Sequence, residues 1–400
     1  LSERLDFMRP GYVRCMINSP YRYYDAATGR YDRMRNLASL RRLLQYCQDN
    51  GITVAYGEYN PPTWAMKDSQ QWVEMSVDYL NFLVCDLGFD CIRHFIIFNE
   101  PDGNWASTDG DYDLWCSMAQ RFDAEMARYP DLKRKVSLAA PDVVMSYKNP
   151  ASEYDTAGWV ARSAQDLGAQ IGIYDVHAYP GQHEVRSGAY AEKLRRIRAE
   201  VPAGKKLILG EAGYKYSAPE DSLLKAEYDR RVVGHPFTKG SDCNMLCYDY
   251  FYGLDMPLLA MEVMNNGLSG VAAWMLDDAM HSNGDSGRTE DVKIWGMWNI
   301  LGEEVFGDAS QEELRPWYYT WSLMCRHFPA GCDILACEVP QREGLRVAAA
   351  RKDAAYSVAA VNFSQEPCTL EIVLPGDFAG GVLYRYTESD RAVSYTHLTL

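Results

Sequence analysis

Short apolar runs alternate with longer amphipathic segments over the first 330 residues, and this alternation admits few architectures. Seven runs have the apolar, β-branched composition of strands: YVRCMIN (12–18), ITVAYGE (52–58), IRHFIIF (92–98), VSLAAP (136–141), IYDVHAY (173–179), KLILGE (206–211) and GVAAWML (270–276). Amphipathic segments such as NLASLRRLLQYCQDNG lie between them and end near glycine, as helices do. Strands that alternate with helices predict a parallel sheet, and continuous apolar strands predict a sheet that is covered on both faces.

A closed barrel of this kind has eight strands, one more than the runs supply. We expect the absent strand to precede Tyr12, because the chain begins with a polar, helix-like piece, LSERLDFMRP. The sequence therefore predicts an α/β fold, a (β/α)8 TIM barrel over residues 1–330 that lacks its first strand in this fragment.

After about residue 335 the pattern changes to short strands with turn residues between them and no helical periodicity. Five runs fit this pattern: ILACEV, LRVAAARK, YSVAAVNF, CTLEIVL and GVLYRYT. We expect a small antiparallel, β-sandwich-like domain over residues 331–393. The final residues, 394–400, end abruptly in SYTHLTL and are a candidate for a non-native tail.

The charge of the chain argues against two classes of partner. There are 40 basic and 55 acidic residues, and the net charge of -15 would repel nucleic acid and anionic membranes. No stretch of about 18 apolar residues occurs, and the first ten residues lack the features of a signal peptide. We therefore expect neither a nucleic-acid partner nor a membrane-spanning protein.

Eleven cysteines lie within apolar runs such as YVRCMIN and WSLMCRHF. We expect most of them to be buried free thiols, which favours a cytoplasmic protein. Cys243 and Cys247 have no second pair at zinc-finger spacing, so we expect no metal ion and no other cofactor. We expect the first barrel strand to be absent from this sequence. Whether a signal peptide precedes that strand is left open.

Two glutamates stand where buried strands end. Glu100 follows the apolar run in HFIIFNEPDGNW, and Glu211 ends KLILGE three strands later. In a parallel barrel the active site lies at the carboxyl ends of the strands, so both side chains should face one cleft. Two carboxylates across a barrel mouth can cleave a glycosidic bond, because one protonates the departing oxygen while the other attacks or stabilises the anomeric carbon.

Four motifs occur in the order FNEP, DVHAYP, LGEAG and AAWML, and this ordered set resembles the clan A glycoside hydrolases. The resemblance spans about 12–328, and NPPTWAMKD (60–68) is similar to a segment of family 30. The β domain after the barrel suits families 30 and 39, and family 5 is also similar. The resemblance implies a retaining β-glycosidase that acts on oligosaccharides or polysaccharides by double displacement.

The resemblance also implies roles for single residues. Glu100 would be the acid/base and Glu211 the nucleophile. Asn99 would hydrogen-bond the 2-hydroxyl of the sugar, a contact that strengthens in the transition state. Arg14 and Tyr179 would orient Glu211 and keep it ionised, since an adjacent cation lowers the pKa of a carboxylate.

Further candidates would line the sugar site. His177 would lie on the same wall, and Trp274 would form an aromatic floor for the apolar face of the sugar. Trp64 and Trp105 follow strands and are candidates for sugar platforms, with core packing as the alternative. Weaker candidates for substrate contact follow the last strand, namely Asp277, Asp278 and His281. We treat residues 213–253, after the second glutamate, as one large loop.

Two other classes of protein remain open. Metal-dependent barrel hydrolases typically carry a His-x-His pair on an early strand; this sequence has none, although the strand expected upstream could hold one. A catalytically inactive sugar-binding barrel is the other alternative. A lone glutamate at a strand end is more often a capping or salt-bridged residue, so catalysis depends on Glu100 and Glu211 together.

Overall fold

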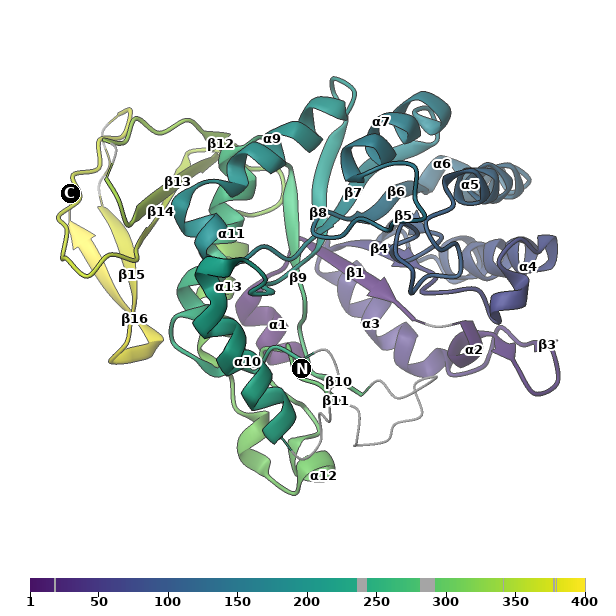
Figure 1. The fold of residues 1–400 in the computed structure, drawn as a ribbon, viewed down its shortest axis with the longest axis horizontal. Helices are drawn as coiled ribbons and strands as arrows, with labels where there is room; N and C mark the ends of the chain where they lie inside the picture. Colours follow the sequence, from purple (N-terminus) through teal and green to yellow (C-terminus); the bar gives the residue numbers. More distant parts are fainter. Residues whose placement is uncertain are drawn as a thin grey trace.

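Seven parallel strands form one sheet in the order in which they occur in the chain (Figure 1). The computed structural model describes residues 1–17, 19–235, 243–280, 292–340, 342–376, 378 and 380–399. The strands are β1 (Tyr12–Met16), β4 (Thr53–Gly57), β5 (Ile92–Ile96), β6 (Ser137–Val144), β7 (Ile171–Ala178), β8 (Lys206–Ala212) and β9 (Gly270–Ala273). Each overlaps one of the seven predicted runs. The sheet curves until β9 comes back near β1, which gives a nearly closed barrel.

Helices cover the outside of this sheet (Figure 1). They include α1 (Ser2–Met8), α3 (Leu37–Asp49), α4 (Gln70–Asn81), α5 (Tyr112–Ala127), α6 (Pro130–Lys135), α7 (Thr156–Leu167), α9 (Tyr190–Glu200), α11 (Tyr252–Asn265) and α13 (Pro316–His327). Apolar spacing explains their orientation: α3 buries Leu40, Leu44 and Cys47, which share one helical face. Two of the helices begin at an aspartate cap, because Asp111 accepts a hydrogen bond from the backbone of α5 and Asp155 from that of α7.

Small and branched side chains fill the interior of the barrel. Each of five neighbouring strands supplies one member of this inner layer, namely Ala55, Ile96, Ala139, Ile173 and Ile208. The inner layer leaves the carboxyl ends of the strands to polar residues. The register decides which of these residues meet, since His177 on β7 lies opposite Glu211 on β8.

The segment 213–253, which we expected to be one large loop, contains ordered helices. It holds α10 (Ser222–Gly234) and short 3₁₀ turns at Pro219–Asp221 and Met245–Tyr248, and α11 begins at Tyr252. The residues of α10 favour helix, but among them only Val232 is buried. Because α10 buries so little, its sequence carries no apolar periodicity. The prediction of one large loop was wrong for this reason.

Antiparallel strands follow the barrel. A three-stranded sheet contains β12 (Asp333–Leu335), β13 (Leu345–Lys352) and β14 (Ala355–Asn362), and a separate hairpin contains β15 (Gly380–Thr387) and β16 (Asp390–Thr399). The strand predicted for CTLEIVL is wrong, because residues 368–374 pair with no strand and leave Ile372 and Val373 exposed. The strand β16, which the sequence did not predict, runs through most of the expected tail.

The remaining short elements are α2 (Ser19–Arg22), β2 (Tyr24–Asp25), β3 (Arg30–Tyr31), α8 (Gln182–Ser187), β10 (Ala279–Met280), β11 (Val292–Lys293) and α12 (Gly302–Phe306), with 3₁₀ turns at Trp64–Met66 and Ala309–Glu312 and a π-helical turn at Phe82–Asp86. In the described part of the chain, every helix is too short or too polar to span a bilayer. The eleven cysteines are free, and six of them are buried.

Candidate active site

Glu100 and Glu211 approach each other at the carboxyl end of the sheet. Glu211 lies in β8, and Glu100 follows β5 by four residues in a left-handed backbone conformation, with φ of 51°. Their side chains are 12% and 10% exposed. One carboxylate oxygen of Glu100 lies within 4.8 Å of one carboxylate oxygen of Glu211. The structure therefore brings together the two glutamates that the sequence singled out.

Arg14 and Tyr179 hold Glu211 from two sides. The Arg14 Nη1 atom donates to Glu211 Oε2 at 2.9 Å, and the Tyr179 hydroxyl donates to Glu211 Oε1. Burial lowers the pKa of Arg14, but the carboxylates of Asp142 and Glu211 raise this pKa by more than burial lowers it. The guanidinium therefore stays charged. Arg14 Nη2 also donates to Asn99 Oδ1 at 2.8 Å, and this contact leaves the amide nitrogen of Asn99 available to a ligand.

Asp142 connects several of these residues, although its sequence position did not mark it as a site residue. Its Oδ2 accepts from Arg14 Nη2 at 2.9 Å, and its backbone oxygen accepts from the backbone nitrogen of Glu100 at 3.1 Å. Burial raises the pKa of Asp142, but Arg14 and His177 lower it below the ordinary value. The only sequence signal is an acid inside the apolar strand SLAAPDVV.

His177 lies between two carboxylates. Its Nδ1 is 2.8 Å from Glu100 Oε1, and its Nε2 is 3.1 Å from Asp142 Oδ1. Burial lowers the pKa of His177, but Asp142 and Glu211 raise it well above the ordinary value. Since both ring nitrogens face acceptors, the ring is an imidazolium that donates to both carboxylates.

Glu100 is held in its ionised form by these contacts. Its Oε2 accepts from Trp105 Nε1 at 2.6 Å, in addition to the contact of its Oε1 with His177. Burial raises the pKa of Glu100, but the hydrogen bond and charge of His177 and the hydrogen bond of Trp105 bring it below the ordinary value.

Two of the predicted tryptophans lie next to the glutamates. Trp105 bonds Glu100 and is 41% exposed, and its ring lies 4.7 Å from that of Tyr147 between centroids. Trp274 follows β9, is half-buried and packs against a small cluster that contains Tyr179 and Trp295. Trp105 thus contacts Glu100 directly from the loop after β5, whereas Trp274 is linked to Glu211 through Tyr179.

Trp64 and Trp295 differ from what the sequence indicated. Trp64 lies in a 3₁₀ turn after β4 and is 56% exposed, and no contact within the described ranges joins it to Glu100 or Glu211. Trp295 was missed; it is buried and meets Tyr179 edge to face at 5.5 Å. Its sequence context, KIWGMWN, resembles ordinary core and gives no sign of this contact.

The acids after the last strand have structural partners. The side chain of Asp278 is buried and accepts from Arg315 Nη1 at 2.8 Å, while Asp277 accepts from the backbone nitrogen of Ile300 at 3.0 Å. The expectation that they contact substrate finds no support in these bonds. His281 lies outside the described residues.

Comparisons with known proteins identify the fold. No family model and no curated protein matches the sequence. Solved structures do match: a glucosidase from Croceicoccus marinus has a TM-score of 0.61 at 12% identity, over 100% of this chain and 76% of that one. A family 39 glycoside hydrolase from Bacteroides cellulosilyticus WH2 has a TM-score of 0.60 at 10% identity, with the same coverage. A family 30 endoxylanase from Clostridium papyrosolvens C71 has a TM-score of 0.55 at 12% identity, over 100% of this chain and 89% of that one.

The chain has the fold of the clan A glycoside hydrolases. The predicted α/β barrel with antiparallel strands after it is confirmed.

The acidic cluster has the residue types of a metal site but not the charge state. Ligand atoms of Glu100, His177 and Glu211 lie within 4.8 Å of one another, and His177 forms a second such group with Asp142 and Asp175. A metal ion needs a neutral imidazole and free carboxylate oxygens. Here the pKa of His177 lies well above its ordinary value, and the Arg14 guanidinium already binds one carboxylate of each group. The residues therefore fit an internal ion-pair network better than a metal centre.

Proposed function

We propose that the protein is a retaining glycoside hydrolase that cleaves β-glycosidic bonds of oligosaccharides or polysaccharides. The observation that carries the proposal is the approach of Glu100 and Glu211, whose oxygens lie within 4.8 Å. Retaining enzymes place their carboxyl groups about 5 Å apart, whereas inverting enzymes need roughly 6.5 to 9.5 Å to admit a water molecule. The named activities of the similar structures, among them a β-xylosidase, an endo-β1,6-glucanase and an endoxylanase, agree in reaction class.

In the first step Glu211 attacks the anomeric carbon and forms a glycosyl ester, while the bond to the leaving oxygen breaks. That oxygen takes a proton from Glu100. Arg14 and Tyr179 direct both oxygens of Glu211, so the attacking carboxylate is positioned before substrate binds. The amide nitrogen of Asn99, whose oxygen accepts from Arg14, then donates to the 2-hydroxyl as positive charge develops at the anomeric carbon.

In the second step a water molecule attacks the glycosyl ester. Glu100, now ionised, takes the proton of this water, and Glu211 leaves as a carboxylate. Two inversions at the same carbon give a product that keeps the β configuration. Trp105 restrains Oε2 of Glu100 in both steps, since its indole nitrogen donates to that oxygen.

Chemical rescue tests both roles. In Glu100→Ala, with an aryl β-glycoside whose leaving group needs no proton, azide should replace water and give the β-glycosyl azide. In Glu211→Gly, with an α-glycosyl fluoride as substrate, azide should attack directly and give the β-azide without an ester intermediate, whereas an aryl β-glycoside should give the α-azide. The exposed residue Glu200 provides a matched control, because Glu200→Ala should behave like the wild type.

The stereochemistry of the wild-type reaction decides the main point. Proton NMR of the sugar first released from nitrophenyl β-glycosides should show the β-anomer. Initial release of the α-anomer would exclude the retaining mechanism and the role of Glu211. Absence of turnover across a broad panel of aryl glycosides and polysaccharides would favour a sugar-binding protein instead.

A further inference from the structure

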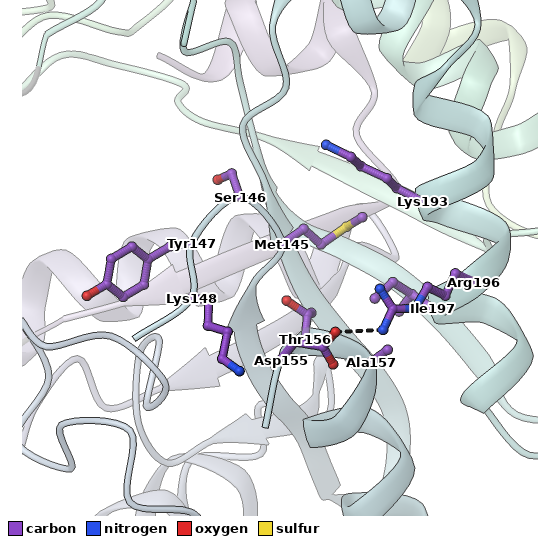
Figure 2. Close-up of a pocket in the computed structure, with 10 residues that line it drawn as sticks. All are labelled: Met145, Ser146, Tyr147, Lys148, Asp155, Thr156, Ala157, Lys193, Arg196 and Ile197. Carbon is purple, nitrogen blue, oxygen red and sulfur yellow. Dashed lines mark hydrogen bonds and ion pairs between the residues drawn. The ribbon is translucent and has the colours of Figure 1, made fainter. Parts of the chain in front are cut away.

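A basic pocket lies beside the carboxyl end of β6, between the start of α7 and the side of α9 (Figure 2). Its volume is 290 Å³, close to the lower limit of about 300 Å³ for small-molecule sites. Figure 2 shows Tyr147 and Lys148 on one side of the pocket and Lys193 and Arg196 on the other. Ile197 is buried and supplies part of the apolar lining.

The pocket is connected to the proposed acid/base by two aromatic rings. Tyr147 lines the pocket and contacts the ring of Trp105, with 4.7 Å between centroids. Trp105 in turn donates to Glu100 Oε2. Since Glu100 protonates the leaving oxygen, a chain that leaves the cleavage point on this side passes over Trp105 and Tyr147 toward the pocket. Aromatic faces of this kind suit the apolar face of sugar rings.

The charge of the pocket is opposite to that of the whole chain. Three basic residues and one acid, Asp155, line it in a protein whose net charge is -15. Arg196 Nη2 bonds Asp155 Oδ2 at 2.6 Å, and Lys193 pairs with Glu184. Lys148 is exposed and its charge acts on Asp155, but no hydrogen bond or ion pair joins its Nζ to another residue of the described chain. An anionic group that enters the pocket would therefore find a cation that needs no rearrangement.

We propose that this pocket binds a sugar unit with an anionic group on the leaving-group side of the cleaved bond. The substrate is then an acidic polysaccharide that carries uronic acid or sulfated residues. Lys148 provides the first contact of the anion, and Lys193 and Arg196 surround it. The inference rests on the proposed function, because Glu100 defines which side holds the leaving group.

The test measures binding to the full chain as Glu211→Gln, which should bind sugars without turnover. The probes are xylo-oligosaccharides with glucuronic acid branches and cello-oligosaccharides oxidised or sulfated at C6, each beside its uncharged parent. At low salt at least one charged probe should bind about tenfold more tightly than its parent, which corresponds to about 1.4 kcal/mol. The advantage should shrink in 0.5 M salt, because salt screens exposed charges.

A double variant locates the effect. Lys148→Gln with Lys193→Gln should reduce the advantage of the charged probe at least threefold. Lys225→Gln provides the control, since Lys225 is an exposed lysine of α10 that pairs with Asp229 and does not line the pocket. Equal affinity for charged and uncharged probes, an advantage that survives in the double variant, or no binding of any probe would each overturn the inference.

The two proposals fail in different ways. Wild-type hydrolysis of neutral aryl β-glycosides without preference for charged oligosaccharides would overturn the anionic pocket and leave the hydrolase intact. A preference for charged oligosaccharides that depends on Lys148, in a protein that hydrolyses no glycoside, would support the anion site and overturn the hydrolase. Tighter binding of the sulfated probe than of the oxidised probe would identify the anion as sulfate.

Discussion

At the scale of single residues, His177 sets the charge of the site. It donates to Glu100 and Asp142 and lies 3.9 Å from Glu211, so three carboxylates share one imidazolium. This arrangement explains why the pKa of Glu100 is below its ordinary value although the side chain is largely buried. When Glu100 is ionised in the free protein, it must bind a proton before it can act as the acid. Protonation is more complete at low pH, so kcat/KM should be greatest at acidic pH.

The variant His177→Gln should move the alkaline limb of kcat/KM to higher pH by about one unit. Glutamine can still donate to Glu100 but carries no charge. Burial raises the pKa of Glu100, and without the positive charge of His177 less opposes this effect. The pKa of Glu100 therefore rises. The measurement is the pH dependence of kcat/KM with an aryl β-glycoside whose leaving group needs a proton.

Trp105→Phe is the control for this pH prediction. It removes a neutral hydrogen bond to the same carboxylate, so its shift should have the same direction and a smaller size. An alkaline limb that stays in place in His177→Gln would show that Glu100 is not the acid.

At the scale of elements, the register of β7 and β8 depends on a glycine. The backbone nitrogen of Gly210 donates to Asp175 Oδ1 at 2.8 Å, and a Cβ at Gly210 would lie 2.0 Å from the same oxygen. Burial, followed by the charge of Asp142, raises the pKa of Asp175 to about 7. This close approach fixes the backbone immediately before Glu211.

Gly210→Ala should lower the free energy of unfolding by about 2 kcal/mol, because the added methyl group overlaps a buried carboxyl that cannot move far. Urea unfolding measures the effect. Gly270→Ala on β9 is the matched control, since its Cβ would meet Ile208 at an ordinary distance of 3.5 Å and the change should be small. Equal stability of the two variants would contradict the close packing of β7 against β8.

At the scale of the whole molecule, the antiparallel strands are attached to the barrel through α11 and the loop before it. Arg346 on β13 bonds Glu262 on α11 at 2.7 Å, and the Tyr386 hydroxyl on β15 donates to the backbone oxygen of Tyr250 at 2.8 Å. Figure 1 shows both small sheets on the same side of the barrel, next to α11 and α13. We propose that the boundary between barrel and β domain lies near residue 330 and that these contacts couple the two parts.

Arg346→Ala should lower the free energy of unfolding by about 1 to 2 kcal/mol, because it leaves the largely buried Glu262 without its cation. Arg351→Ala is the control: that arginine pairs with Asp333 within the exposed sheet, and its loss should hardly change stability. Thermal melts of both variants measure the difference. A separate early transition in the wild type would contradict the coupling.

The sequence by itself determined the barrel and its two glutamates. Strands covered on both faces must be apolar throughout, so the seven runs stood out without knowledge of their neighbours. Glu100 and Glu211 were identifiable because the carboxyl ends of parallel strands meet at one edge. The apolar runs and the positions of the two glutamates can each be recognised within a single strand segment, without knowledge of which strands are neighbours.

Only the tertiary structure decided which residues meet across the barrel. Asp142 and Trp295 were not identified, because their importance lies in contacts with residues more than 30 positions away. The run CTLEIVL has the composition of a strand but no partner, whereas β16 is a strand because β15 pairs with it. A strand needs a neighbour to satisfy its backbone hydrogen bonds, and no local pattern specifies that neighbour.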